Sequence, residues 1–453
     1  MRGPCITAGS PATARNVVAP GRWDNRLEAN GGFVAVPRPR RISLEYDYST
    51  AAGMILRPVM IMRRECPICG SVEKESIYGQ RFTELSEGGL FDGYDVVVCN
   101  QCGFGFADNI PSQAEFDNYY KQMSKYENEH LGGQVSESAL STYRSIVQAA
   151  KSVLPNKEAR ILDIGCATGA LLAEFKANGY KNVTGVDPSP SCARTAMQLY
   201  KIQVLNQPIS EIPELEASFD FLILNSVLEH IREVNTSLQA LRKLLKPGGM
   251  IWIEVPDTVH FSQWTSVAFQ QFSMEHINFF SAISLTNLMK KNQFEPIGIW
   301  HNERQLEAVT DPALSAIFQK ATALPENSGP KYDDETKPAL LDYIERSHQT
   351  DSGVLTKISA LVKSGRPIIV WGVGTHTQRL LASSSLADAK ITAFVDSNPR
   401  YQNKTLNGIR IMPPQQLAGK FEPIVISSRL YQEEIAKQIR YELNLPNEII
   451  RLY

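Results

Sequence analysis

Residues 159–187 constrain the fold of this chain more than any other stretch of the sequence. Residues 161–164 form a short apolar run, which is typical of a buried parallel strand. Residues 170–177 carry apolar side chains at helical spacing, and 183–186 form a second apolar run that ends at Asp187. A strand, a crossover helix and a second strand ending in an acid predict an α/β fold with a ligand site at the carboxyl ends of its strands.

The glycine turn inside this unit indicates which ligand it suits. Gly165 and Gly169 bracket the turn with Ala167 between them, so the Gly-x-Gly-x-x-Gly pattern of dinucleotide sites is not met. Asp163 precedes the turn, and its carboxylate would repel a pyrophosphate but attract an ammonium and a sulfonium. S-adenosylmethionine carries both cations, and Asp187 could accept hydrogen bonds from its two ribose hydroxyls. Another type of nucleotide-binding α/β domain is the alternative.

Further stretches follow in an order that identifies a family. Residues 219–224 predict the fourth strand of the sheet, 225–230 follow it, and 244–249 form the turn before a fifth strand at 250–255. In these stretches the chain resembles the class I S-adenosylmethionine-dependent methyltransferases. The resemblance implies a set of cofactor-binding residues, namely Asp163, Gly165, Gly169, Asp187 and Asn225.

Composition sets limits on partners and location. The 453 residues carry 46 Lys and Arg against 48 Asp and Glu, so a net charge of −2 offers no general attraction to nucleic acid or to an anionic membrane. No apolar run approaches the roughly 18 residues that a membrane-spanning helix needs. We therefore expect a cytoplasmic protein with a small-molecule substrate, no nucleic-acid partner and no membrane span.

The first 61 residues differ from the rest of the chain. They are rich in arginine, poor in acids and lack the apolar core of a secretory signal. We expect a disordered extension or a wrongly assigned start, with Met60 or Met62 as the true first residue. A transit peptide is the alternative.

Four cysteines predict a metal site. Cys66 and Cys69 form one Cys-x-x-Cys pair and Cys99 and Cys102 another, each followed by glycine. This pattern is typical of a zinc site in which four thiolates close the tetrahedron and leave no place for water, so the zinc would be structural. Two disulfides or a redox pair are the alternatives, although the lack of a secretory signal argues against disulfides.

The C-terminal part repeats the α/β pattern. Residues 367–376 predict a buried strand that runs into a glycine turn, and 391–399 predict a second strand that ends in an acid. Gly372 and Gly374 alone are a weak signal, so a Rossmann-like domain is expected while its ligand stays open. Residues 311–365 are predicted to form connecting helices.

The segment before the first strand is predicted to be helical from residue 111 to 154. Its tyrosines could close over the cofactor or pack against the edge of the sheet; they are Tyr119, Tyr120, Tyr126 and Tyr143.

The order of these parts from Cys66 onward resembles the three-domain deoxysugar C-methyltransferases, which act on nucleotide-linked 4-keto sugars. The resemblance implies that His276, preceded by Glu275, is the base at the carbon next to the ketone, and that His230 is a second histidine of the site. Ser273 stands where the family has a tyrosine that supports the enolate oxygen. This departure favours an O-methyltransferase acting on a sugar or glycan hydroxyl, because removing a hydroxyl proton needs only a base.

The expected fold class is α/β, with a class I methyltransferase sheet, an N-terminal zinc-binding module and a second Rossmann-like domain at the C-terminus. The expected parts are an extension (1–61), a zinc-binding module (62–108), a methyltransferase domain (109–310), a helical connector (311–365) and a Rossmann-like domain (366–453). The expected function is C-methylation of a nucleotide-linked keto-sugar in glycan or secondary-metabolite biosynthesis. The alternatives are O-methylation and a binding protein that keeps the fold without catalysis.

Overall fold

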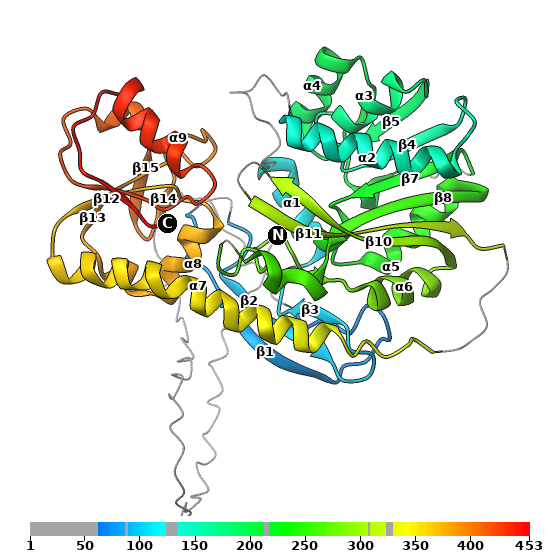
Figure 1. Cartoon of the computed structure of the whole chain (residues 1–453), viewed down its shortest axis with the longest axis horizontal. Helices are drawn as coiled ribbons and strands as arrows, with labels where there is room; N and C mark the ends of the chain where they lie inside the picture. Colours follow the sequence, from blue (N-terminus) through cyan, green and yellow to red (C-terminus); the bar gives the residue numbers. More distant parts are fainter. Residues whose placement is uncertain are drawn as a thin grey trace, which may run out of the picture. The chain divides into compact units, whose positions relative to one another are not determined.

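The computed structural model describes residues 62–453 except 87–88, 124–134, 213–216, 266, 307–308 and 323–328. The predicted extension at 1–61 and Tyr126 lie outside the described residues. Within them the strands form three sheets, which Figure 1 shows with the helices that accompany them.

The central sheet has seven strands in the order β10-β11-β8-β7-β4-β5-β6. Strands β8, β7, β4, β5 and β6 pair in parallel, whereas β11 pairs antiparallel with both β8 and β10. Their bounds are β4 Arg160–Ile164, β5 Asn182–Val186, β6 Val204–Leu205, β7 Phe219–Asn225, β8 Leu245–Pro256, β10 Phe294–Leu306 and β11 Val309–Lys320. The four strands predicted between residues 161 and 255 are therefore confirmed.

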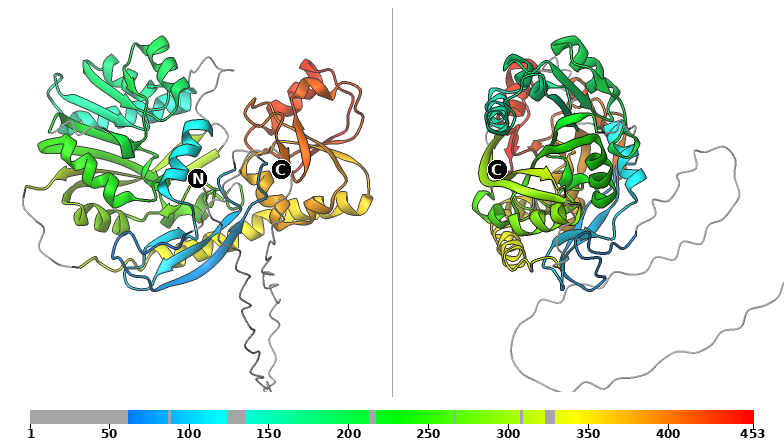
Figure 2. Two further views of the ribbon diagram at one scale, coloured as in Figure 1. Left: turned by 180° about the vertical axis from the view of Figure 1, so that it is seen from behind. Right: turned by 90° about the vertical axis from the view of Figure 1, so that its right-hand side faces the viewer.

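Helices cover both faces of this sheet because its inner strands are apolar on both sides. In β7, Leu222 and Leu224 pack with α5 (Val234–Leu244) and α6 (Ala282–Lys291). Phe221 and Ile223 point the other way and pack with α2 (Glu137–Val153) and α3 (Ala170–Ala177). The two layers can be followed from behind in Figure 2. A further helix, α4 (Pro190–Tyr200), follows β5.

The prediction that helices begin at residue 311 is wrong. Residues 311–318 are buried in β11, with Leu314, Ala316 and Phe318 on one face of the sheet and Ile317 on the other. A strand that is apolar on both faces shows no alternation, so its sequence alone does not distinguish it from a buried helix. The central sheet consequently continues past residue 310, and the connector is one long helix, α7 (Thr336–Ser364).

The N-terminal sheet is antiparallel and has the order β1-β2-β3-β9. Strands β1 (Lys74–Arg81), β2 (Gly93–Cys99) and β3 (Gly105–Asp108) come from the predicted zinc-binding module. The fourth strand, β9 (Asn278–Phe279), comes from far along the chain, directly after the segment that holds His276. Helix α1 (Gln113–Met123) follows β3.

The C-terminal sheet has the order β14-β15-β13-β12-β16-β17, and all its pairs are parallel except β14 with β15. Its strands are β12 Ile368–Trp371, β13 Ile391–Val395, β14 Thr405–Leu406, β15 Ile409–Met412, β16 Ile424–Ile426 and β17 Ile449–Arg451. Helix α8 (Thr375–Ser383) follows the glycine turn, and α9 (Gln432–Lys437) precedes β17. The parallel strands agree with the sequence expectation, while a Rossmann-like ligand-binding role stays a prediction.

None of the helices in the described part of the chain combines the length and the apolar character needed to cross a membrane.

Candidate functional site

The turn between β4 and α3 adopts a conformation that few residues tolerate. Gly165, Ala167 and Gly169 have positive φ angles of 72°, 46° and 80°. A Cβ atom on Gly165 would lie 2.7 Å from Val227 Cγ2, so a side chain there would collide with the loop after β7. A left-handed alanine beside two such glycines is strained backbone, and such strain is often found at ligand sites.

Asp187 connects the end of β5 to this turn. Its Oδ2 accepts a hydrogen bond from the Ala167 backbone N–H and its Oδ1 one from the Ser189 N–H, both at 2.9 Å. Burial raises the pKa of Asp187, and these two hydrogen bonds partly oppose that rise. Each carboxylate oxygen has a second lone pair, so the group can still accept two hydroxyls.

Asp163 and Asn225 lie on the strands beside it. The Asp163 side chain in β4 is buried, and burial together with the neighbouring charge of Asp187 holds its pKa well above the usual range. At the end of β7, the side-chain Oδ1 of Asn225 is buried and accepts no hydrogen bond from any described residue. Because β5, β4 and β7 are neighbours, their carboxyl ends bring both acids and this amide to one edge of the sheet.

These groups suit S-adenosylmethionine. The buried carboxyl of Asp163 resists ionisation, so it gains most from a cationic ligand. The two carboxylate oxygens of Asp187 suit a diol. The buried amide oxygen of Asn225 needs a hydrogen-bond donor. The five residues that the sequence singled out for the cofactor thus lie together, and their role in binding stays a proposal.

A second cluster surrounds the predicted histidines. His230 ends a short 3₁₀ turn after β7, and its ring centroid lies 5.1 Å from that of His276. The His230 Nδ1 lies 2.8 Å from the backbone oxygen of Glu275, which can only accept, so Nδ1 carries the proton and Nε2 keeps the lone pair. The buried carboxylate of Glu229 lies 3.8 Å from that Nε2.

Two tyrosines of α1 reach the same cluster. The hydroxyl of Tyr119 donates to Glu275 Oε1 at 3.2 Å, and the ring of Tyr120 stands edge-on to His230 at 5.9 Å. Tyr143, by contrast, lies in α2 and packs, partly buried, against the core between the helices α2 and α3 and the central sheet.

Ser273, the departure from the family pattern, shapes the loop that carries His276. Its Oγ accepts the backbone N–H groups of Glu275 at 3.3 Å and His276 at 3.2 Å. The hydroxyl of Tyr94 donates to the Ser273 backbone oxygen at 3.0 Å. Ser273 therefore orders the turn before His276.

The histidine loop is fastened to the N-terminal sheet. The Ile277 N–H donates to the Glu229 backbone oxygen at 2.9 Å, and the Ala107 N–H of β3 donates to the Ile277 oxygen at 2.9 Å. The buried guanidinium of Arg64 donates to the Ile277 oxygen and to Asn278 Oδ1, both at 3.1 Å. The position of His276 thus depends on the sheet that the cysteine module builds.

The four cysteines of that module converge. Sγ of Cys66 lies 3.5 Å from that of Cys102, Sγ of Cys69 lies 3.4 Å from that of Cys99, and all four sulfurs lie within 4.8 Å of one another. A disulfide needs about 2.05 Å, so these pairs are not disulfides. Zinc–sulfur bonds of about 2.3 Å in a tetrahedron place sulfurs roughly 3.8 Å apart, which the cluster can accommodate. Zinc fits this donor set, and its presence stays a proposal.

The C-terminal domain repeats the geometry of the first turn. Asp396 follows β13, and its Oδ2 accepts the Val373 N–H at 3.0 Å while its Oδ1 accepts the Asn398 N–H at 2.8 Å. The Gly372 N–H donates to the Val395 backbone oxygen at 2.8 Å, as the Gly165 N–H does to its partner on β5. The acid that the sequence predicted after this second strand is therefore placed like Asp187.

Sequence reasoning missed two members of the site. Glu229 precedes His230 in the stretch 225–230. Its carboxylate matters to the site because it is buried beside the histidine, and only tertiary packing determines that burial. Arg64 lies two residues before Cys66, and nothing in the sequence distinguishes it from the other arginines of the preceding arginine-rich segment.

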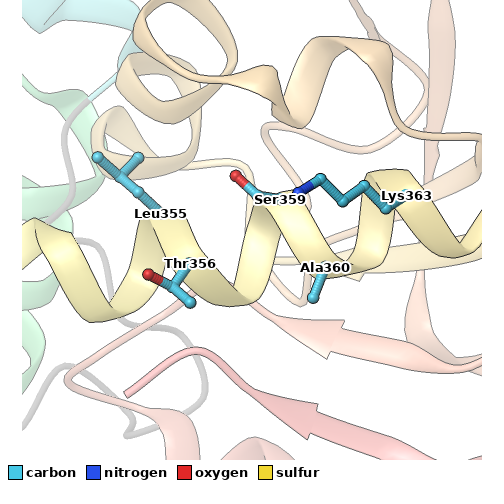
Figure 3. Close-up of a pocket in the computed structure, with 5 residues that line it drawn as sticks. All are labelled: Leu355, Thr356, Ser359, Ala360 and Lys363. Atoms are coloured by element: carbon cyan, nitrogen blue, oxygen red, sulfur yellow. The ribbon is translucent and has the colours of Figure 1, made fainter.

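A hollow beside α7 has no connection with these residues. It is lined by Leu355, Thr356, Ser359, Ala360 and Lys363, which Figure 3 shows on one stretch of the helix. None of them is a predicted site residue.

Comparison with known families agrees with this description of the central sheet. Residues 139–298 match a family described as a methyltransferase domain, and residues 365–450 match one described as C2185-like, N-terminal. The central region is a class I S-adenosylmethionine-dependent methyltransferase domain of Rossmann-like α/β fold.

Individual relatives match the same region. A ubiquinone biosynthesis O-methyltransferase of Xylella fastidiosa is 31% identical over 150 residues, which are 31% of this chain and 58% of that protein. A tRNA U34 carboxymethyltransferase of Shewanella baltica is 33% identical over 109 residues, 22% of this chain and 33% of that protein. The chain thus spans between a third and three fifths of the length of these relatives.

Among solved structures, a 1,6-didemethyltoxoflavin-N1-methyltransferase of Burkholderia thailandensis is 20% identical with a TM-score of 0.37. The alignment covers 49% of this chain and 96% of that one.

Proposed function

We propose that this chain transfers a methyl group from S-adenosylmethionine to the carbon beside the ketone of a nucleotide-linked keto-sugar. The methyl-transfer chemistry is supported by the methyltransferase domain and by the residues at the carboxyl ends of β4, β5 and β7. The choice of a sugar rests on the resemblance to the deoxysugar C-methyltransferases. A cytoplasmic location and the lack of a nucleic-acid partner stay predictions.

The cofactor supplies an electrophilic methyl group, so the chain has to hold the acceptor in line, remove a proton and exclude water. Asp187 would bind the ribose hydroxyls, and Asp163 would bind the cationic end of the ligand. The buried side-chain oxygen of Asn225 would accept a hydrogen bond from a donor group of the ligand. Gly165 and Gly169 let the backbone approach closely.

His276 is the proposed base, with His230 beside it. The hydrogen bond from His230 Nδ1 to the Glu275 carbonyl orients that ring, and the Glu229 carboxylate would attract a proton to its Nε2. An imidazolium at His230 could stabilise the enolate oxygen that forms when His276 takes the carbon-bound proton. This would supply the support that the missing tyrosine gives in the family.

One observation carries the proposal. Strand β7 ends at Asn225, and the turn that follows it ends at His230, so a single strand end connects the proposed cofactor pocket with the histidine pair. Open α/β sheets place their chemistry at this edge.

O-methylation of a sugar hydroxyl is the second candidate. It is favoured by Ser273, whose hydroxyl orders a turn where a tyrosine would serve carbon chemistry. The names of the O-methyltransferase relatives agree with it. A protein that binds the cofactor without catalysis is the third.

A deuterium-exchange experiment separates these candidates. The purified full chain is incubated in D₂O with S-adenosylhomocysteine and a panel of nucleotide-linked 4-keto sugars, and the sugars are examined by mass spectrometry. Carbon methylation predicts deuterium at the carbon beside the ketone, and a methyl group on that carbon once S-adenosylmethionine is supplied. A methyl ether without exchange would establish O-methylation, and no product from any sugar or glycan precursor would exclude both enzymatic functions for these substrates.

The cofactor site has a matched control in the same chain. Asp187→Asn should weaken S-adenosylmethionine binding at least tenfold, because hydrogen bonds to a charged group contribute about 1.5–3 kcal/mol each. Asp396→Asn changes the same geometry in the other domain and should leave that affinity unchanged. Equal losses in both variants, measured by calorimetry, would contradict the assignment.

A further inference from the structure

A third cluster of metal-ligating side chains shares no residue with the four cysteines or with the proposed active-site histidines. Asp257 follows β8 directly, His260 lies in the 3₁₀ turn Thr258–Trp264, and His301 lies in β10. The Nδ1 of His260 lies 2.7 Å and the Nδ1 of His301 2.6 Å from the same oxygen, Asp257 Oδ2. The two imidazole rings meet edge to face at 5.1 Å.

We propose that Asp257, His260 and His301 bind a divalent transition-metal ion, with zinc as the best-suited ion. Two imidazole nitrogens and one carboxylate are ligands that suit zinc, and the carboxylate can bind through one oxygen or through both. The proposal does not depend on the methyl-transfer reaction.

The carboxylate gives the first reason. Asp257 is only 1% exposed, and its other oxygen, Oδ1, is buried and accepts no hydrogen bond from the described residues. A buried carboxylate oxygen without a donor is costly and calls for an ion or a water molecule. A cation bound through both oxygens would satisfy Oδ1 and Oδ2 together.

The backbone holds this carboxylate in place. The Asp257 N–H donates to the Pro312 oxygen of β11 at 3.2 Å, and the His260 N–H donates back to the Asp257 oxygen at 3.0 Å. The 3₁₀ turn brings residues three apart to the same side, so His260 faces the acid that begins the turn. The ligands thus come from one fixed strand end and from β10, which β11 separates from it in the sheet.

The histidines can adjust to an ion. Zinc bonds of about 2.0–2.2 Å in a tetrahedral arrangement separate ligand atoms by roughly 3.4 Å, so each Nδ1 would withdraw by less than about 1 Å. The side chains of His260 and His301 are 31% and 51% exposed and have room for this movement. With neutral imidazoles, the carboxylate leaves the three ligands with one negative charge for a divalent ion.

The alternative is a pair of hydrogen bonds without metal. It requires both imidazoles to carry their proton on Nδ1 and to donate to one oxygen, which leaves Oδ1 without a donor. The two cases differ in whether the native protein takes up a metal ion at these residues.

Cobalt(II) tests this directly, because cobalt bound to thiolates has an intense near-ultraviolet charge-transfer band that cobalt bound to nitrogen and oxygen lacks. The full chain as purified, dialysed against a weak chelator, is titrated with Co²⁺ and followed by calorimetry and absorption. We expect one equivalent of Co²⁺ to bind without producing the thiolate band. We expect His301→Ala to weaken this binding at least tenfold. His276→Ala removes a histidine of the other cluster and should leave this binding intact.

Three outcomes would overturn the proposal. They are no cobalt binding apart from the thiolate signal, equal affinity in wild type and His301→Ala, and loss of binding in His276→Ala but not in His301→Ala. His301 lies half exposed on a strand, so its truncation should not unfold the protein, and circular dichroism checks this. His260→Ala provides an independent second variant with the same expectation.

Discussion

Replacing Asp163 with asparagine should make the ligand-free protein more stable and S-adenosylmethionine binding weaker. Asparagine keeps the shape of the side chain, so the change removes the charge without leaving a cavity. Burial and the charge of Asp187 raise the pKa of Asp163 well above its usual range. A group with a raised folded-state pKa contributes stability that is complete below its unfolded pKa, near 3.9, and is lost as the pH rises through the folded pKa.

The size of both effects follows from burial. Asp163 is 2% exposed, so solvent screens its charge little. Relieving a buried group of an unfavourable charge should raise the free energy of unfolding by about 1–3 kcal/mol above the folded pKa. Losing a charged partner for the cation should cost about 1.5–3 kcal/mol of binding, which is roughly a tenfold to 150-fold weaker affinity.

Denaturant unfolding with and without S-adenosylmethionine measures the first effect, and calorimetry measures the second. Wild-type affinity should also increase with pH through the folded pKa of Asp163, and the variant should lose that dependence. Asp220→Asn in β7 is a matched control, because the pKa of Asp220 is shifted in the opposite direction. Burial alone would raise the pKa of Asp220, but hydrogen bonds from Lys246 and the Arg160 N–H outweigh burial and lower it.

The control variant should therefore lose a little stability and keep its affinity for the cofactor. An Asp163→Asn protein that is less stable than wild type, or that binds S-adenosylmethionine as tightly, would refute the reasoning.

Three further predictions test other parts of the molecule. His276→Ala should lower turnover by about 10²–10⁴ with nearly unchanged cofactor affinity, whereas a lower stability with normal turnover of the folded fraction would mark His276 as structural. Cys99→Ser should release about one zinc per chain by elemental analysis and lower turnover, because β3 supports the loop of His276; a fully active, metal-free variant would contradict both points. Burial, with a smaller effect of Arg379, lowers the pKa of His376 to about 3, so stability present above pH 6.5 should be lost as the pH falls toward 3. Between pH 6.5 and 5 the free energy of unfolding measured in urea should fall by up to about 2 kcal/mol. The same measurement on His376→Gln should show a smaller fall.

Four strands of the central sheet were predictable because each carries a local signal. Apolar runs mark β4, β5, β7 and β8, a glycine turn follows β4, and Asp187 after β5 marks the ligand edge. β11 was not predictable because its pattern is apolar on both faces. Only pairing with β8 and β10 decides that residues 311–320 are extended.

The histidine site was predictable in part. His230 and His276 could be named from the resemblance, and the structure brings their rings to 5.1 Å. The partner of His230 could not be named, because the Glu275 backbone oxygen that sets its tautomer has no sequence signature. Neither could the pairing of β9 with β3, which joins residues far apart in the chain.

The two glycine turns show how far such local signals carry. Gly165 and Gly372 each donate to the strand that precedes the acid, at 2.8 Å in both domains, so Asp187 and Asp396 occupy similar positions, although the turn donates to Asp187 from the second residue after the glycine and to Asp396 from the first. Two residues before the glycine, however, the central domain has Asp163 and the C-terminal domain has Val370. Both turns can therefore hold a diol, but only the central one has a buried carboxyl for a cation. This difference, and not the turn itself, is our reason for proposing the S-adenosylmethionine site in the central domain, and it is the reason that Asp187→Asn and Asp396→Asn should differ.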